Sequence, residues 1–431
     1  MDLSQPIPPE VYVLTLGALG IVCGTIIFKY AYKSAVRPSE ELPQGFGAFQ
    51  RSYLTVYLLC TFSDWLKGPY VYALYEAYGF TKGQIAWLFI MGYISSLIFG
   101  TTAGALSDKF GRKLMCQVFC IVYALSAVTK VINDFWVLML GRALSGVATS
   151  LLFTTFEAWM VSEHQSRGYP ANLLTDTFSK ATLGNGCVAI AAGVVAQMAA
   201  MWSYAMPFLA AIPCLMVALY IIRNWSENYG STTIAPWATI TKGLQAIAIE
   251  PRLRWLGMCE AAFEGCMYVW VFFWTPALAT EETKHAVPYG IVFACYMAAF
   301  MIGGSLPQYI SMDRLPYGLH TTALVVTGVA TVFYDAKLLV FFSFVIFEGT
   351  VGSYFPTHGT IRSKAIDETT RAAVMNLFRV PLNLYVVLLL QIKWTTQEAL
   401  GVLVFTHLFS VGCLAMFRAT PATHHGEHIT V

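Results

Sequence analysis

Ionisable residues inside long apolar segments are the most chemically informative feature of this 431-residue sequence. A charged side chain at the centre of a membrane-spanning helix costs about 3 kcal/mol on insertion scales, so such residues need a partner, water or a ligand. They can form ion pairs, exchange protons or hold a small ion of opposite charge. The candidates are Asp64, Lys67, Arg142, Glu157, Glu260, Glu264, Glu348 and Arg379.

Depth within the apolar segments separates these residues. Four lie well inside and are candidates for a functional role: Asp64, Arg142, Glu264 and Glu348. Two lie nearer one end, where a structural or gating pair is expected: Glu157 and Glu260. Lys67 precedes Gly68-Pro69, which should free backbone groups locally, although its long side chain can also reach outward to water. For each charge the alternative is an ion pair that holds two helices together.

Uncharged polar residues add possible hydrogen-bond donors. Asn185 lies between two glycines, and Asn376 lies three residues before Arg379. Both can donate to an anion, although an Asn within a helix interface commonly joins helices instead. The ten cysteines lie mostly in apolar segments without a Cys-x-x-Cys pair, so we predict packing roles, no metal and no cofactor. Motifs of metalloproteases, serine hydrolases and phosphate-binding loops are absent from the sequence, which argues against an enzyme.

The composition shows which elements must position these side chains. Charged residues make up 12% of the chain, about half of the roughly 25% of a soluble protein. Several apolar segments approach the ~20 residues that an α-helix needs to cross a bilayer. With a net charge of +2 and no basic stripe, the sequence gives no indication of nucleic-acid binding. We predict spans at 11–28, 50–75, 84–106, 113–131, 134–158, 181–200, 203–223, 253–279, 287–310, 318–334, 337–356, 371–392 and 396–417.

These spans predict an all-α polytopic membrane protein with one extra N-terminal helix and two halves of six helices. The expected divisions are an anchor helix with its linker at 1–49, a first half at 50–223, a linker at 224–252, a second half at 253–418 and a tail at 419–431. A short interfacial helix is expected at 237–249. Lys and Arg gather in alternate loops, which places the C-terminus in the cytosol and the N-terminus outside.

The loop between the second and third helices of the first half carries a motif. It reads Gly104-Ala-Leu-Ser-Asp108-Lys-Phe-Gly111-Arg112-Lys113. Gly104 permits close helix approach, Asp108 can cap a helix N-terminus, and Gly111 permits a tight turn. Arg112 and Lys113 remain in water and can bridge to Asp108.

This loop resembles the signature loop of the major facilitator superfamily, which builds transporters from two six-helix repeats. The resemblance implies that the loop latches the cytosolic side of the protein shut. Further stretches resemble one branch, the eukaryotic molybdate-anion transporter family: Asp64-Trp-Leu-Lys67-Gly-Pro-Tyr-Val-Tyr, Gly141-Arg142-Ala-Leu-Ser-Gly146, Phe156-Glu157-Ala-Trp159, Arg223-Asn-Trp-Ser-Glu-Asn-Tyr229, Phe263-Glu264, Phe273-Trp-Thr-Pro276, Tyr354-Phe-Pro356 and Asn376-Leu-Phe-Arg379-Val-Pro381. This second resemblance implies import of the oxyanion molybdate, with the plasma membrane as the expected location.

The superfamily also suggests roles for individual residues. In its proton-coupled sugar porters an Asp in the first core helix faces an Arg in the fourth, and Asp64 and Arg142 occupy comparable places. Asp64, Glu264 and Glu348 are therefore the candidates for proton coupling. For the anion we expect Arg379, whose planar guanidinium matches two oxygens of a tetrahedral oxyanion, assisted by a second group of residues: Asn376, Arg142, Lys67 and Asn185.

Two other functions remain open from the sequence. One is a carrier for another small solute, such as a sugar or an organic acid, because a fold does not determine a substrate. The other is a membrane receptor or scaffold that kept the fold without transport. The buried charges argue against the scaffold, since it gains little from their cost.

Overall fold

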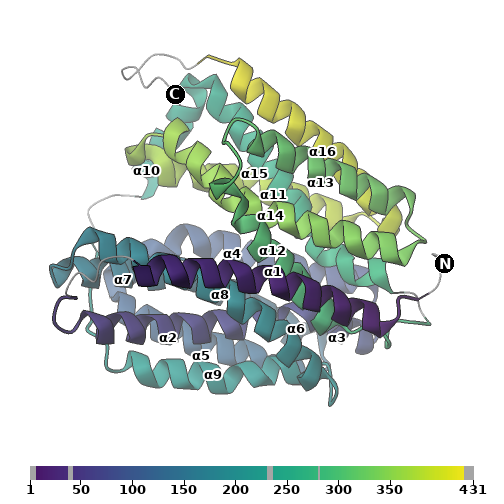
Figure 1. Ribbon diagram of the computed structural model, residues 1–431, viewed down its shortest axis with the longest axis horizontal. Coiled ribbons are helices and arrows are strands. Elements are labelled where there is room, and N and C mark those ends of the chain that lie inside the picture. The colour runs from purple at the N-terminus through teal and green to yellow at the C-terminus, as the bar shows by residue number, and fades with distance from the viewer. Residues whose placement is uncertain (1–5, 37–41, 231–235, 280–281, 422–431) are drawn as a thin grey trace. The chain divides into compact units, whose positions relative to one another are not determined.

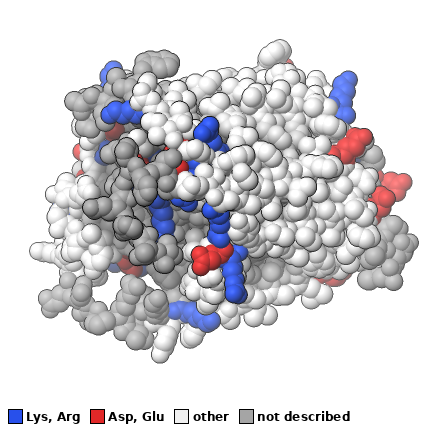
Figure 2. Space-filling view, turned by 90° about the horizontal axis from the view of Figure 1, so that it is seen from above, with Lys and Arg blue, Asp and Glu red and all other residues white. Residues whose placement is uncertain are grey.

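The computed structural model describes residues 6–36, 42–230, 236–279 and 282–421, and in these ranges the regular elements are helices (Figure 1). Each predicted span coincides with helix. Eleven helices among the described residues are long and apolar enough to cross a membrane. The predicted spans at 50–75 and 203–223 correspond to α2 and α9, which lie outside this set of eleven, α9 being 17 residues long. Most of the face shown in Figure 2 is neither acidic nor basic, as expected for a surface in contact with lipid.

The chain forms two compact units. The first, here called the N-terminal unit, comprises Pro6–Thr232 and Ala279–Ile302. Its helices are α1 (Pro9–Val36), α2 (Phe46–Trp65), η1 (Gly68–Tyr70), α3 (Val71–Ala77), α4 (Lys82–Phe110), α5 (Arg112–Val128), η2 (Thr129–Val131), α6 (Phe135–Leu152), α7 (Thr155–Ser166), α8 (Ala171–Ala200), α9 (Met206–Ile222) and most of α12 (Tyr289–Gly304).

The second, here called the C-terminal unit, comprises Thr233–Leu278 and the chain from Gly303 onward. Its helices are α10 (Pro236–Ile249), α11 (Pro251–Leu278), η3 (Leu306–Gln308), α13 (Leu315–Val332), α14 (Lys337–Ala365), α15 (Glu368–Gln391) and α16 (Thr396–Ala419). The helix predicted at 237–249 forms as α10, and its place at the membrane interface stays a prediction. It approaches α15 closely, because a Cβ on Gly243 would lie 2.8 Å from the Cβ of Ala373.

The assignment of α1 and α12 differs from the predicted halves. Helix α12 was expected in the second half but packs in the N-terminal unit, where a Cβ on Gly193 of α8 would lie 2.6 Å from the carbonyl oxygen of Gly290. Helix α1 lies against α12, since the thiol of Cys295 donates to the backbone oxygen of Tyr12 at 3.5 Å. Glycine therefore permits the α8–α12 contact, which apolar periodicity alone does not specify.

Helices α4 and α6 cross at small residues. A Cβ on Gly146 would lie 2.8 Å from the Cβ of Ser95, so a larger residue has no room. The Ser95 hydroxyl donates to the Ala143 carbonyl at 2.7 Å, and the Ser150 hydroxyl donates to that of Ser96 at 3.0 Å. Small residues and interhelical hydrogen bonds replace the hydrophobic effect, which is weak between helices in lipid.

The first core span is broken as predicted. Helix α2 ends at Trp65, and Gly68-Pro69 form a short 3₁₀ turn before α3 begins. Proline lacks the amide hydrogen that a continuous helix needs at this place. The break puts Lys67 on a turn inside the bundle rather than on a helix face.

Candidate functional site

Asp64 lies at the end of α2, directly before this break. Its carboxylate accepts a short hydrogen bond from the hydroxyl of Tyr123 on α5. Tyr123 is 2% exposed, so the hydrogen bond forms in a dry environment, where a charged acceptor makes it stronger than a neutral one. The sequence did not single out Tyr123, because one tyrosine among 23 carries no distinctive signal.

Two lysines are buried in the same region. The ammonium of Lys67 lies 2.7 Å from the centre of the Tyr123 ring and has no hydrogen-bond acceptor among the described residues. Lys130 is 2% exposed and donates to the hydroxyl of Tyr75 at 2.7 Å. Lys130 lies at the end of the span predicted at 113–131. It is buried because η2 continues α5 by one turn and folds its side chain against α3.

Arg142 of α6 completes this group. Its Nε donates to the Leu88 carbonyl at 3.0 Å, and its guanidinium lies 5.0 Å from the centre of the Phe89 ring. A Cβ on Gly92 would lie 2.7 Å from a guanidinium nitrogen, so this glycine makes room for the arginine. The predicted ion pair between Asp64 and Arg142 does not form within 4.0 Å in the described chain, because each side chain has another partner.

The cluster holds more basic groups than acidic ones. Lys67 is in electrostatic range of Asp64 and Arg142, and Lys130 of Lys67 and Arg142. Among the described residues, Asp64 is the one carboxylate that acts on Lys67. Three basic groups therefore face one acidic group, and we call these four residues the cation cluster.

Asn185 lies nearby in α8 and has a structural contact. Its side-chain oxygen accepts from the indole of Trp65 at 2.9 Å, which joins α8 to α2. The amide nitrogen of Asn185 takes no part in this bond and can still donate. The structure thus shows the helix-joining contact, and a contact with substrate stays a prediction.

In the C-terminal unit, the predicted acidic residues divide into two environments. Glu264 accepts a hydrogen bond from Tyr354 at 2.9 Å and lies 3.9 Å from Arg362, which pairs more closely with Glu260 at 3.2 Å. Glu260 thus has the structural ion pair expected for its position. Glu348 is 4% exposed and forms no ion pair among the described residues.

Arg362 lies beyond the end of the span predicted at 337–356. Helix α14 instead contains Pro356 and continues to Ala365, which brings the guanidinium inside the unit. Arg379 has the opposite outcome: it is exposed, and its guanidinium forms no ion pair with a described residue. The alternative pairing of Arg379 with Glu264 or Glu348 is therefore absent, although its charge does act on Glu264. Asn376, half-buried, has no hydrogen bond that would oppose its predicted role.

The loop motif is organised by its own ion pair. Asp108 accepts from both Nε and Nη2 of Arg112, at 2.9 and 2.7 Å, which confirms the predicted bridge. Gly111 has φ 108°, a backbone conformation that favours glycine. Gly104 has open space around its Cβ position, so close helix approach at that residue is not seen within the unit.

The predicted helix cap was assigned to the wrong acid. Glu227, not Asp108, accepts from the first backbone amides of α5, those of Lys113 at 2.8 Å and Leu114 at 3.1 Å. The Lys113 ammonium donates to the Arg223 carbonyl at 2.9 Å. The stretch 223–230 thus closes over the loop, anchored by Trp225, whose ring stacks on Trp159 with centroids 3.8 Å apart. The stretch 223–229 indicated the family in the sequence, but it did not predict this contact.

Comparison with solved structures fits this architecture. The xylose transporter XylE from E. coli, in a partially occluded inward-open conformation, matches with a TM-score of 0.64 at 11% identity, covering 88% of this chain and 100% of that one. The nucleoside transporter NupG matches with a TM-score of 0.62 at 13% identity, covering 86% and 98%. A family model described as sugar transporters with 12 transmembrane helices matches residues 11–346. The fold and the loop define a multi-pass membrane transporter of the major facilitator superfamily.

Within that superfamily the chain belongs to the molybdate-anion transporter family. The molybdate-anion transporter of Xenopus laevis is 34% identical over 392 residues, which cover 86% of this chain and 85% of the relative. That of Danio rerio is 34% identical over 380 residues, covering 79% and 78%. Both resemblances drawn from the sequence are therefore confirmed.

The cap on α5 leads to a prediction about stability. Glu227→Ala leaves the Lys113 and Leu114 amides without this acceptor, which we expect to cost about 0.5–2 kcal/mol, as for other helix N-caps. The measurement is thermal unfolding of the purified protein in detergent. Glu157→Ala is the control, because Glu157 is exposed and makes no such bond. An equal loss of stability in both variants would contradict a capping role for Glu227.

Proposed function

We propose that this protein is a secondary transporter that imports molybdate across the plasma membrane by alternating access, and that it is not an enzyme. Support comes from the relatives, which are named as molybdate-anion transporters and match most of the chain. In the structure, the observation that supports the proposal is the cation cluster. Its Lys67 has a buried ammonium without an acceptor.

The charge of the cluster suits a dianion. With all four groups ionised, Lys67, Lys130, Arg142 and Asp64 leave a formal excess of two positive charges, which molybdate would neutralise. A buried charge without a partner destabilises the protein. An anion that pairs with this charge therefore binds favourably. Hydrogen-bond donors in a rigid surrounding also replace the water that the anion loses. A neutral sugar would leave the excess charge uncompensated.

Asp64 connects this site to energy coupling. In the proposed cycle, protonation of Asp64 raises the positive excess and favours anion entry, and loss of the proton reverses it. Because Asp64 directly precedes the break in the first core span and Lys67 lies on the turn itself, the same event acts on a turn that can change conformation. Protons are then the coupling ion, and Tyr123 holds the carboxylate between events.

Uptake into liposomes tests the function directly. We expect saturable molybdate uptake that tungstate inhibits strongly, since it has the same charge and shape, and that sulfate inhibits less. The panel includes sugars and organic acids, because the matching family model is described by sugar transport. Flux of an organic solute without molybdate flux would refute the proposal, and absence of any flux would favour a receptor.

The cation cluster predicts the effect of removing one charge. Lys67→Gln should weaken molybdate binding at least tenfold, about 1.4 kcal/mol, because the charge excess falls while the side chain stays polar. Binding is measured with the purified protein by calorimetry. Lys109→Gln is the matched control, since Lys109 is exposed outside the cluster. Unchanged affinity in Lys67→Gln would remove Lys67 from the site.

Arg379 gives an independent prediction in the C-terminal unit. Arg379→Lys keeps the charge but loses the two-pronged donor, so binding should weaken by at least ~1–2 kcal/mol, the scale of a hydrogen bond to a charged group. Thermal stability should stay nearly constant, because Arg379 holds no ion pair among the described residues. A Lys variant that binds normally, or one that unfolds, would show that Arg379 does not hold the anion.

Proton coupling is tested separately from binding. Asp64→Asn should abolish accumulation driven by a proton gradient while exchange of molybdate across the membrane at equilibrium continues. The assay compares both modes in the same liposomes. If the variant still accumulates molybdate with the wild-type dependence on pH, Asp64 is not the coupling residue, and Glu264 and Glu348 remain as candidates.

A further inference from the structure

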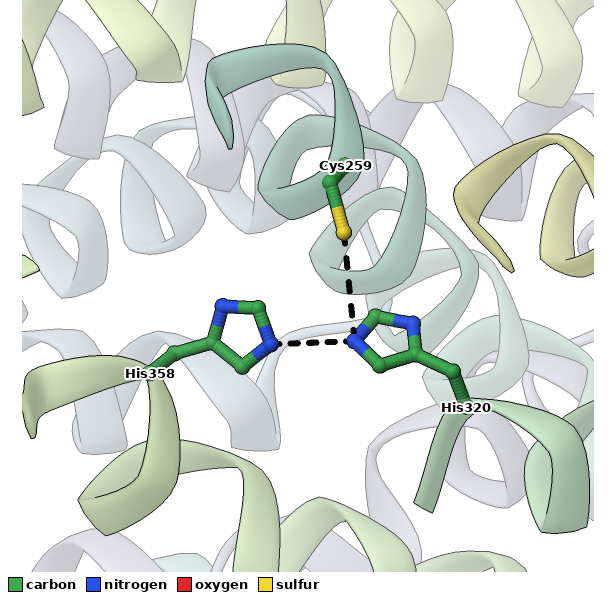
Figure 3. A group of neighbouring side chains, drawn as sticks. All are labelled: Cys259, His320 and His358. Carbon is green, nitrogen blue, oxygen red and sulfur yellow. Dashed lines mark hydrogen bonds between the residues drawn. The ribbon is translucent and has the colours of Figure 1, made fainter. Parts of the chain in front are cut away.

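A second buried cluster lies wholly inside the C-terminal unit. Cys259 on α11, His320 on α13 and His358 on α14 are each 0% exposed (Figure 3). The Nε2 atoms of the two histidines are 2.9 Å apart, and Cys259 Sγ lies 3.9 Å from Nε2 of His320. The three candidate donor atoms lie within 4.8 Å of one another. The function proposed above uses none of these residues.

The hydrogen bonds on the far sides of the rings limit where their protons are. The Ser410 hydroxyl lies 3.1 Å from the Cys259 carbonyl and 2.9 Å from Nδ1 of His320, and it can give its one proton to either. Nδ1 of His358 lies 3.1 Å from Glu260, whose carboxylate also binds Arg362 and therefore accepts. His358 thus carries its proton on Nδ1, and His320 does so when Ser410 donates to the carbonyl.

The two Nε2 atoms can therefore meet in two ways. With a proton on Nε2 of His320 they form a hydrogen bond of 2.9 Å. With both ring protons on Nδ1, two lone pairs face each other and can bind a metal ion. The sulfur of Cys259 favours the metal, because its thiolate adds a third strong donor, whereas its thiol is only a weak hydrogen-bond partner.

We propose that Cys259, His320 and His358 bind a soft monovalent metal ion, Cu⁺, through Sγ and the two Nε2 atoms. Thiolate and imidazole donors suit Cu⁺. On binding, the thiol loses its proton to solvent, and the resulting thiolate neutralises the ion. Glu260 pairs with Arg362, so the thiolate and Cu⁺ together add no net charge to this buried region. Zn²⁺ would add one positive charge and would want a fourth ligand, beyond the three that the described residues offer.

The surroundings of the rings support a metal site. Metal-binding histidines commonly donate their other ring N–H to a carboxylate or another oxygen, which orients the ring. His358 has Glu260 in this position, and His320 has Ser410. Stacking of Tyr354 on His358, with centroids 4.3 Å apart and planes at 26°, restrains the second ring further. The sequence predicted no metal, because these residues lie 38 to 99 positions apart without a motif.

The test uses the full-length protein in detergent with ascorbate as reductant. Cu⁺ is supplied in competition with a chromogenic chelator, and bound copper is counted per chain. We expect one Cu⁺ per chain, release of about one proton, and X-ray absorption that shows one sulfur and two nitrogen ligands. Cys259→Ser, His320→Gln and His358→Gln should each weaken binding at least a hundredfold. Ser410→Ala, which keeps all three ligands, should weaken it about ten- to a hundredfold.

Matched controls come from the same unit. Cys266→Ser and His407→Gln remove another buried thiol and another buried imidazole, on α11 and α16, and should change the Cu⁺ affinity less than threefold. No copper bound by the wild type would overturn the proposal and leave a shared proton between the rings. Zn²⁺ held in preference to Cu⁺ would overturn it too, as would unchanged affinity in the folded Cys259 and His320 variants. The wild-type absorption spectrum decides the ligands even if a variant fails to fold.

Discussion

Burial of charge away from water is the constraint on which the rest of this structure depends. A hydrophobic helix bundle offers few ways to keep an ionised group: an opposite charge, aligned donors, an aromatic face or a ligand. The protein uses several of these. Arg112 binds Asp108 and Arg362 binds Glu260, and the Lys67 ammonium lies over the Tyr123 ring. In the cation cluster these means are insufficient, which is what makes the cluster a candidate for anion recognition.

The two units handle buried polar groups differently. In the N-terminal unit, basic groups outnumber the acidic group that faces them. In the C-terminal unit, Glu260 joins an imidazole and a guanidinium into a chain of hydrogen bonds that ends at Ser410. The first arrangement leaves basic groups that an anion from outside the protein can pair with. The second is held together within the protein, through the contact between the two histidines.

How much the sequence predicts depends on the range of the interaction. Helix positions follow from local apolarity, and the break at Gly68-Pro69 follows from proline chemistry, so both were predicted. The Asp108–Arg112 ion pair joins residues four positions apart in the sequence and was predicted as well. Partners far apart in the chain were not: Tyr123 for Asp64, and Glu227 for α5. Periodicity says which face of a helix is buried, but not which residue of another helix meets it.

The contact of residues 223–230 with the start of α5 bears on the order in which the chain acquires structure during synthesis. The amide of Arg112 donates to the Asn228 carbonyl at 3.0 Å. More than a hundred residues must therefore be synthesised after the start of α5 before the acceptors of its first amides exist. Helix α12 arrives later still, after α11 of the other unit has been made. The N-terminal unit can thus be completed only when part of the C-terminal unit has already been synthesised.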